Sequence, residues 1–436
     1  MLLALPPPLH ERILVQAGRG GQGAASACRA LCDAWRSAPR QPTGAARYLV
    51  ARYGGRAALH AYSCPGLLRF ALAGVPRAGV AERPVDGEGG GGAHDAYILR
   101  LLSAVEAIIG AEPWPPGAEG ELLAQAAAAG HLGVVRRMLR AGAAADARAL
   151  CAAAGQGHLA VVREVLAAAA AGSGGAAAAA ALATGGLEAA ATYGEAEVLA
   201  ALLAAGADVR HDGSGALVAA ATWGNEECVK LLLAAGAAAE GLHVLCWASK
   251  FGHGEVVRLL LGAGADVAAG ESTPLCLASN FGHAAVATLL LGAGADPNAR
   301  GGLALRAAAD NGHEEVVRVL LRAGADPGAR DGQPLCLAAS HGHAGVVVAL
   351  VGSGADPNAQ RGIALCFAAH NGHEEVVRVL LGAGADPGAR DGQPLRSAAS
   401  HGHAGVVVAL VGSGADPNAQ KGMALCFAAH QGHEEV

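Results

Sequence analysis

Residues 252–266 read Gly-His-Gly-Glu-Val-Val-Arg-Leu-Leu-Leu-Gly-Ala-Gly-Ala-Asp, and residues 372–386 repeat the pattern almost unchanged. The histidine after the turn glycine recurs every 30 residues from His253 to His433, and earlier copies end in His131 and His158. Glu195 and Asn225 occupy the same position in two further units, so eleven units begin between about Gly120 and the end. A fixed period of this size indicates a repeat architecture.

Each unit is predicted to hold two short helices. In one unit, Ala364–Asn371 is the first helical pattern, Gly372-His373 makes a turn, and Glu374–Leu381 is the second, with Val and Leu at helical spacing. Gly384 follows where a C-terminal cap needs a left-handed residue. Helices of about eight residues are marginal alone, so stacking on neighbouring units must stabilise them.

The repeated pattern resembles the ankyrin repeat. The start of the first helix matches that family once in full, at Thr273-Pro274-Leu275, with Cys276 where the family usually has His. Ankyrin units average about 33 residues, whereas most of these have 30, and the missing residues fall after the Asp of Gly-Ala-Asp. The resemblance implies an all-α ankyrin solenoid of stacked helix-turn-helix units with short or trimmed hairpin fingers, preceded by a small helical N-terminal segment.

Three regions are expected. Residues 1–40 form an F-box-like helical segment, and residues 41–119 are a poorly patterned region with a Gly-rich linker or degenerate repeats. Residues 120–436 form the ankyrin-repeat domain of about eleven units, the last one truncated. Because Val436 falls midway through a second helix, we expect the chain to be a fragment of a longer protein.

The composition suits many thin layers rather than one large core. Hydrophobic residues make up 53% of the chain but aromatic residues only 3%, and 65 residues are glycine. The net charge of -6 offers no basic field for a phosphate backbone, so nucleic acid is an unfavoured partner. A signal peptide and a membrane span are also not supported, and the expected location is cytoplasmic, nuclear or both.

Six cysteines share one position of the repeat, seven residues before the turn histidine. Equivalent atoms of successive repeats should stand about 10 Å apart, beyond the reach of a disulfide. We therefore expect reduced thiols that serve packing. These residues are Cys151, Cys246, Cys276, Cys336, Cys366 and Cys426.

The first forty residues resemble an F-box, a segment that docks on the Skp1-type adaptor of a ubiquitin ligase. A Leu-Pro helix start is followed by a Leu-Cys-x-x-Trp-Arg ending at a suitable distance. The middle departs from that family, since Gly18–Gly23 replaces an apolar stretch, and a plain helical hairpin is the alternative. The adaptor-binding positions that the resemblance implies are Leu5, Pro6, Leu9, Ile13, Leu14, Leu31, Cys32 and Trp35.

No motif predicts catalysis, a cofactor or a metal. Gly18–Gly23 matches G-x-G-x-x-G but lacks the acidic residue and the alternating strands of a dinucleotide fold. Histidine pairs such as His341/His343 and His370/His373 have spacings that metals use, but the Gly-His histidine of ankyrin units is a structural turn residue that bonds locally. The sequence also shows no nucleophile with a partnered base, so we expect a protein that is not an enzyme.

The position just before the turn glycine is the best functional candidate. It is aromatic in four adjacent units and polar in those that follow. In an ankyrin stack this position faces the concave groove, where exposed rings supply contact area for a partner. The alternative is that the rings pack against the turn. The predicted partner-binding residues are Tyr193, Trp223, Phe251, Phe281, Asn311, His341, Asn371 and His401.

Residues 303–362 and 363–422 are near-copies that differ at eight of sixty positions. Five differences, at 306, 307, 310, 336 and 337, fall in predicted first helices, and the second helices are predicted to be identical. First helices line the concave face of ankyrin repeats. Such a distribution is typical of a binding face varied on a fixed frame, although chance could also produce it.

These observations predict a protein that holds another protein on a repeat-built groove. The leading hypothesis is a substrate receptor of an SCF-type ubiquitin ligase, with a Skp1-type adaptor at the N-terminal segment. The alternative is an ankyrin scaffold with no ligase link. A third possibility is an enzyme with a domain beyond Val436.

Overall fold

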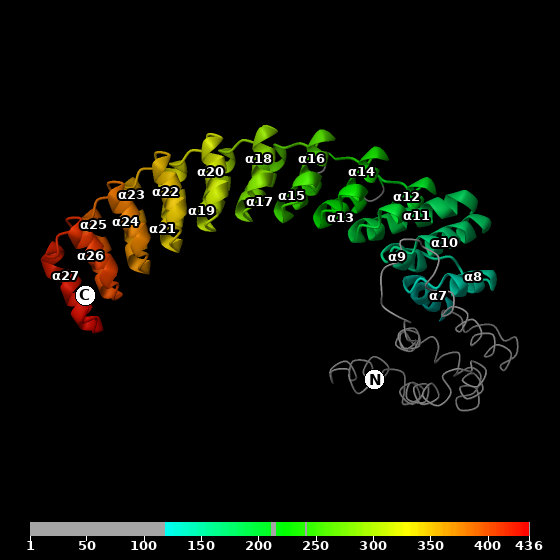
Figure 1. The fold of residues 1–436 in the computed structure, drawn as a ribbon, viewed down its shortest axis with the longest axis horizontal. Helices are drawn as coiled ribbons and strands as arrows, with labels where there is room; N and C mark the ends of the chain where they lie inside the picture. The colour runs from blue at the N-terminus through cyan, green and yellow to red at the C-terminus, as the bar shows by residue number, and fades with distance from the viewer. Residues whose placement is uncertain (1–117, 211–214, 240–241, 436) are drawn as a thin grey trace, which may run out of the picture. The chain divides into compact units, whose positions relative to one another are not determined.

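The computed structural model describes residues 118–210, 215–239 and 242–435, and these residues form 21 α-helices and no strand (Figure 1). The helices alternate along the chain between a first and a second helix of each unit. The first helices are α7 Ala118–Ala128, α9 Ala147–Ala154, α11 Gly175–Tyr193, α13 Gly215–Trp223, α15 Leu242–Phe251, α17 Ala269–Asn280, α19 Ala299–Asp310, α21 Ala329–His341, α23 Ala359–Asn371, α25 Ala389–Ser400 and α27 Ala419–Gln431. The second helices are α8 Leu132–Arg140, α10 Leu159–Ala171, α12 Ala196–Ala204, α14 Glu226–Ala234, α16 Gly254–Gly262, α18 Ala284–Gly292, α20 Glu314–Arg322, α22 Ala344–Gly352, α24 Glu374–Gly382 and α26 Ala404–Gly412.

The chain divides into two compact units. The first unit comprises the chain up to Ala220 together with Lys230–Ala237. The second unit comprises Ala221–Val229 and Ala238–Val436. Within the second unit, first helices pack on first helices from α15 to α27, and second helices pack on second helices from α16 to α26. Figure 1 shows α15, α17, α19 and α21 as one row and α16, α18, α20 and α22 as the other. The fold is the stacked helix-turn-helix solenoid that the sequence predicts.

Small and branched side chains fill each layer. Leu305 of α19 and Val317 and Leu320 of α20 are completely buried, as are Ala308 and Ala309 on the first helix. Burying one Val or Leu contributes roughly 1.5–3 kcal/mol. The alanines let neighbouring first helices approach closely, so a few larger side chains suffice for each layer.

The shared cysteine position is a packing position, as expected. Cys246, Cys276, Cys336 and Cys366 are buried, Cys151 is partly buried, and Cys426 is exposed. Every cysteine of the described residues is a free thiol. Burial raises the pKa of the Cys246 and Cys336 thiols to about 11, so both stay protonated at neutral pH.

A left-handed turn replaces the hairpin finger in the 30-residue units. In α21, the residues Arg330, Asp331 and Gly332 have φ of 49°, 61° and 77°. A Cβ on Gly332 would lie 2.7 Å from the Cβ of Ala359 in the next unit, so a side chain here would be strained and would have to shift its neighbour. The same three-residue turn occurs in α17, α19, α23, α25 and α27.

The first helix predicted from Ala364 agrees with α23, because Gln360, Arg361 and Gly362 are left-handed and the regular helical backbone follows them. One detail of the predicted second helices is wrong. The second helices of the near-copies are not identical, since α20 ends at Arg322 and α24 at Gly382. This exposed helix end tolerates either residue because no packing depends on it.

Among the described residues, no helix is both long and apolar enough to cross a membrane.

Candidate functional site

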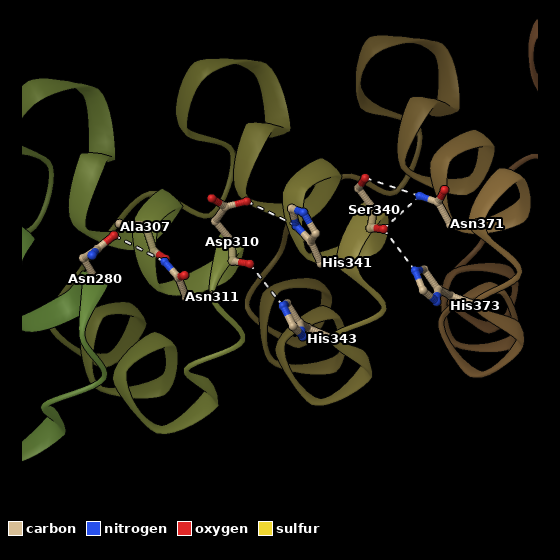
Figure 2. Close-up of polar contacts among 9 residues, drawn as sticks. All are labelled: Asn280, Ala307, Asp310, Asn311, Ser340, His341, His343, Asn371 and His373. Atoms are coloured by element: carbon tan, nitrogen blue, oxygen red, sulfur yellow. Dashed lines mark hydrogen bonds and ion pairs between the residues drawn. The ribbon is translucent and has the colours of Figure 1, made fainter. Parts of the chain in front are cut away.

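The turn histidines join each unit to the one before it. His343 stands at the start of α22, but its ring makes no cap bond there; its Nε2 lies 3.1 Å from the backbone oxygen of Asp310, the last residue of α19. The last carbonyls of a helix have no partner within it, so the Nε2–H donates to a group that would otherwise be unsatisfied. The expectation of a local bond is therefore wrong, because the ring reaches back to the previous unit (Figure 2).

The same bond recurs along both compact units. Its length ranges from 2.9 to 3.3 Å. In the first unit it joins His158 to the Ala128 oxygen, and in the second it joins His253 to Thr222, His283 to Lys250, His313 to Asn280, His373 to Ser340, His403 to His370 and His433 to Ser400.

The turn glycine makes room for that ring. Gly312 has φ of 75°, and a Cβ there would lie 2.6 Å from Nδ1 of His343. This pairing of glycine and histidine fixes where the preceding residue stands, at the end of each first helix. That preceding residue is the predicted partner-binding position.

The aromatic side chains at this position are exposed. Tyr193 and Trp223 are 64% and 63% exposed, and Phe251 and Phe281 are each 45% exposed. In the first unit, the Tyr193 ring also lies against the preceding turn, since a Cβ on Gly155 would be 3.1 Å from its Cδ2. A ring can thus contact the turn and still offer most of its surface, so the two alternatives raised from the sequence are compatible.

Two residues that the sequence analysis missed complete this region. Trp247, one helical turn before Phe251, stacks on it with ring centroids 5.9 Å apart. The Lys250 ammonium lies 4.8 Å from the Trp247 ring centroid, 5.3 Å from that of Phe251 and 5.6 Å from that of Phe281. We call Trp247, Lys250, Phe251 and Phe281 the aromatic segment. The i, i+4 spacing of Trp247 and Phe251 on one helix could have revealed it.

The four polar residues at the same position are also exposed, but three of them bond to the preceding unit. We call Asn311, His341, Asn371 and His401 the polar segment. Figure 2 shows three of them reaching back. The amide of Asn311 contacts Asn280 Oδ1 at 3.3 Å, His341 Nδ1 lies 3.2 Å from a carboxylate oxygen of Asp310, and the Asn371 amide donates to the Ser340 oxygen at 2.9 Å.

His401 differs from the other members of the polar segment. Its Nδ1 lies 2.8 Å from the Ser397 oxygen within its own helix. Its ring meets that of His370 in the preceding unit edge to face, with centroids 4.2 Å apart. This contact occurs in the unit where His370 replaces the Asp310 of the near-copy.

The varied positions of the near-copies lie where they were predicted. Residues 306, 307 and 310 belong to α19, and residues 336 and 337 belong to α21. Both are first helices, so the row that carries the aromatic and polar segments also carries most of the sequence variation.

Three further features of the sequence analysis are the candidate metal ligands, the glutamates at the start of second helices and the N-terminal motifs. Within the described ranges, no group of three or more His, Cys, Asp or Glu side chains is placed to hold a metal ion. The glutamates that open α20 and α24 form ion pairs along the helix, Glu314 with Arg318 and Glu374 with Arg378. The F-box-like residues from Leu5 to Trp35 and the glycine motif Gly18–Gly23 lie outside the described residues.

Comparison with known families agrees with the geometry. The family described as "Ankyrin repeats (3 copies)" matches residues 187–271, 245–331 and 335–421, together more than half of the chain. The comparison with curated proteins finds no match.

Proposed function

The chain belongs to the ankyrin-repeat family, and from that premise we propose that it binds a partner protein on its first-helix row, with the aromatic segment as the centre of the contact. Ankyrin repeats are protein–protein interaction modules rather than enzymes. The observation that carries the proposal is the exposed cluster of Trp247, Phe251 and Phe281 around Lys250.

Exposed aromatic side chains favour binding for a physical reason. They cover a large area and lose little conformational entropy on binding, so Trp and Tyr are enriched among residues whose truncation costs about 2 kcal/mol or more. Trp247 and Phe251 already restrain each other by stacking. A partner that covers them therefore has little further ordering cost to overcome.

The test is an affinity capture with the intact chain and two double variants. Phe251→Ala/Phe281→Ala removes two rings of the aromatic segment. Val348→Ala/Val408→Ala is the matched control, because it removes exposed apolar side chains from the second helices α22 and α26. Proteins captured by the wild type and the control but not by the aromatic variant are then purified and titrated by calorimetry. Equal affinity for all three chains would refute the proposal.

We further propose that this module serves as the substrate receptor of an SCF-type ubiquitin ligase in the cytoplasm or nucleus. The support is the F-box resemblance of Leu5-Pro6 and Leu31–Trp35, and the alternative is an ankyrin scaffold without a ligase link. The variant Leu9→Asp/Trp35→Ala should lose a co-purifying Skp1-type adaptor and keep the partner of the aromatic segment. Absence of any such adaptor from the wild-type capture would leave only the scaffold.

A further inference from the structure

Lys250 is the feature that says most about the partner. It is the last residue but one of α15, and its ammonium lies within 6 Å of three ring centroids from two successive units. No carboxylate among the described residues forms an ion pair with it. The rings hold the charge in place, and nothing in the described part of the chain neutralises it.

The neighbouring units of the second compact unit carry no such charge. The position of Lys250 in those units is filled by neutral, acidic or imidazole side chains. Those residues are Thr222, Asn280, Asp310, Ser340, His370, Ser400 and His430. The fixed cation therefore occurs together with the aromatic rings and at no other equivalent position of that unit.

The charge selects between two kinds of ligand. An exposed cation–π contact is worth about 0.5–1 kcal/mol, and Lys250 already occupies the ring faces that a cationic side chain of a partner would need. A second cation would also be repelled by the ammonium. A carboxylate meets the opposite situation, because it pairs with Lys250 while the rings lower its exposure to water and strengthen the attraction.

We propose that the aromatic segment recognises a segment of the partner in which an Asp or Glu side chain lies next to an aromatic or branched aliphatic side chain. The carboxylate pairs with Lys250, and the apolar neighbour packs on Phe251 and Phe281. This inference rests on the proposed function, since it names the chemistry of the partner at the same site.

The test starts from a random peptide library displayed against the intact wild-type chain. The strongest peptide is then synthesised with its acidic residue and with the corresponding amide. Both peptides are titrated against wild type, Lys250→Met, Lys250→Arg and Phe251→Ala/Phe281→Ala. Lys250→Met keeps the length and apolar character of the side chain, so it removes little besides the charge.

We expect enrichment of an acidic residue beside an apolar one. Lys250→Met should lower the affinity for the acidic peptide about 10-fold and the affinity for the amide peptide less than about twofold. Lys250→Arg should retain most of the affinity for the acidic peptide. Added salt should reduce the affinity of the acidic peptide for the wild type, because the pair is partly screened.

The outcomes separate this inference from the proposed function. If the enriched peptides lack an acidic residue but still need Phe251 and Phe281 to bind, the proposed carboxylate recognition is wrong and the proposed binding face is kept. Enrichment of basic peptides that bind better to Lys250→Met would also overturn it. Binding that ignores the Phe251→Ala/Phe281→Ala change, or no enrichment on the wild type, would count against both proposals.

Discussion

Phe251 and Phe281 of the aromatic segment occupy the same position of the ankyrin repeat as the polar segment, but their contacts differ. Phe251 and Phe281 leave 45% of their surface exposed, and their contacts are to other rings and to Lys250. Asn371 and His341 instead bond to the preceding unit through Ser340 and Asp310. One position is therefore left open in one stretch of the solenoid, where we propose recognition, and bonds successive units in the next.

The largest effect expected from this comparison is on binding. Phe251→Ala/Phe281→Ala should reduce the binding free energy of the partner by roughly 3 kcal/mol, about 100-fold in affinity. The reason is that the variant removes two exposed rings from the centre of the proposed contact. Its urea midpoint should stay close to that of the wild type, since little buried surface is lost. The matched change Asn371→Ala/His401→Ala should leave the affinity within about threefold. A partner lost equally from both variants would erase the distinction between the segments.

A second prediction exchanges one residue of the left-handed turn between the segments. Ser272 has φ of 62° where the later units have glycine, as at Gly332 with φ of 77°. Gly332→Ser should lower the free energy of unfolding by about 2 kcal/mol, from left-handed strain and the approach to Ala359. Ser272→Gly should change it by less than about 0.5 kcal/mol, because relief of strain offsets loss of the contact from Ser272 Oγ to the Asp296 amide.

Urea unfolding followed by circular dichroism measures both exchanges. Gly352→Ala is the control, because Gly352 lies in α22 and a Cβ there meets nothing within 4 Å. It should be neutral or stabilising, since alanine favours a helix more than glycine does. A Gly332→Ser chain as stable as the wild type would mean that the turn does not require its glycine.

A third prediction tests the frame that the two segments share. His283 bonds the Lys250 oxygen beside the aromatic rings, and His343 bonds the Asp310 oxygen beside the polar segment. His283→Ala and His343→Ala should each lower the free energy of unfolding by about 1.5 kcal/mol, because each leaves a helix-terminal carbonyl without its hydrogen-bond donor. Hydrogen exchange should show the loss of protection at the junction with the preceding unit, and the exposed His430→Ala should show none. Unequal costs would mean that the two segments differ in more than their exposed residues.

Much of this frame could be predicted from the sequence, for reasons that particular residues make clear. The 30-residue period and the Val-Val-x-x-Leu pattern follow from the geometry of a buried stripe, so helices such as α24 were located almost to the residue. The left-handed turn at Arg330 and Asp331 could not be foreseen, because few non-glycine residues adopt positive φ and two of them in succession are not marked by these residue types. The reach of His343 to Asp310 likewise depends on how successive units stack.

The candidate site was predictable only in part. Comparison of one repeat position found Phe251 and Phe281 but not Trp247 and Lys250, which lie at other positions of the repeat. The Trp247 position is aromatic again at Phe367 and Phe427, whereas no other unit of the second compact unit has a lysine or arginine at the Lys250 position. Trp247, Lys250 and Phe251 lie within one helical turn of one another on α15, and their side chains are in contact there.

A fourth prediction concerns a single bond of the polar segment. Asn371→Ala removes the amide that donates to the Ser340 oxygen, but His373 Nε2 still lies 3.0 Å from the same oxygen. The carbonyl keeps one hydrogen-bond donor, so the free energy of unfolding should fall by only about 0.5 kcal/mol. Combining Asn371→Ala with His373→Ala should cost more than the sum of the separate losses, because only the pair leaves Ser340 without a donor. Simple additivity in urea unfolding would show that the two bonds act independently.

The last effect is absent at neutral pH and appears only in alkali, and it involves Cys246 of α15 and Cys336 of α21. Burial raises the pKa of Cys246 and Cys336 from 9.0 to about 11 in the folded chain. Unfolding releases these protons more readily, so the stabilisation is complete below pH 9 and declines as the pH rises through about 11. Cys246→Ala/Cys336→Ala should therefore flatten the fall of the urea midpoint over that interval, whereas Ser249→Ala, at a fully buried position of α15, should not. An unchanged slope in the cysteine variant would show that these thiols titrate alike in the folded and unfolded chain.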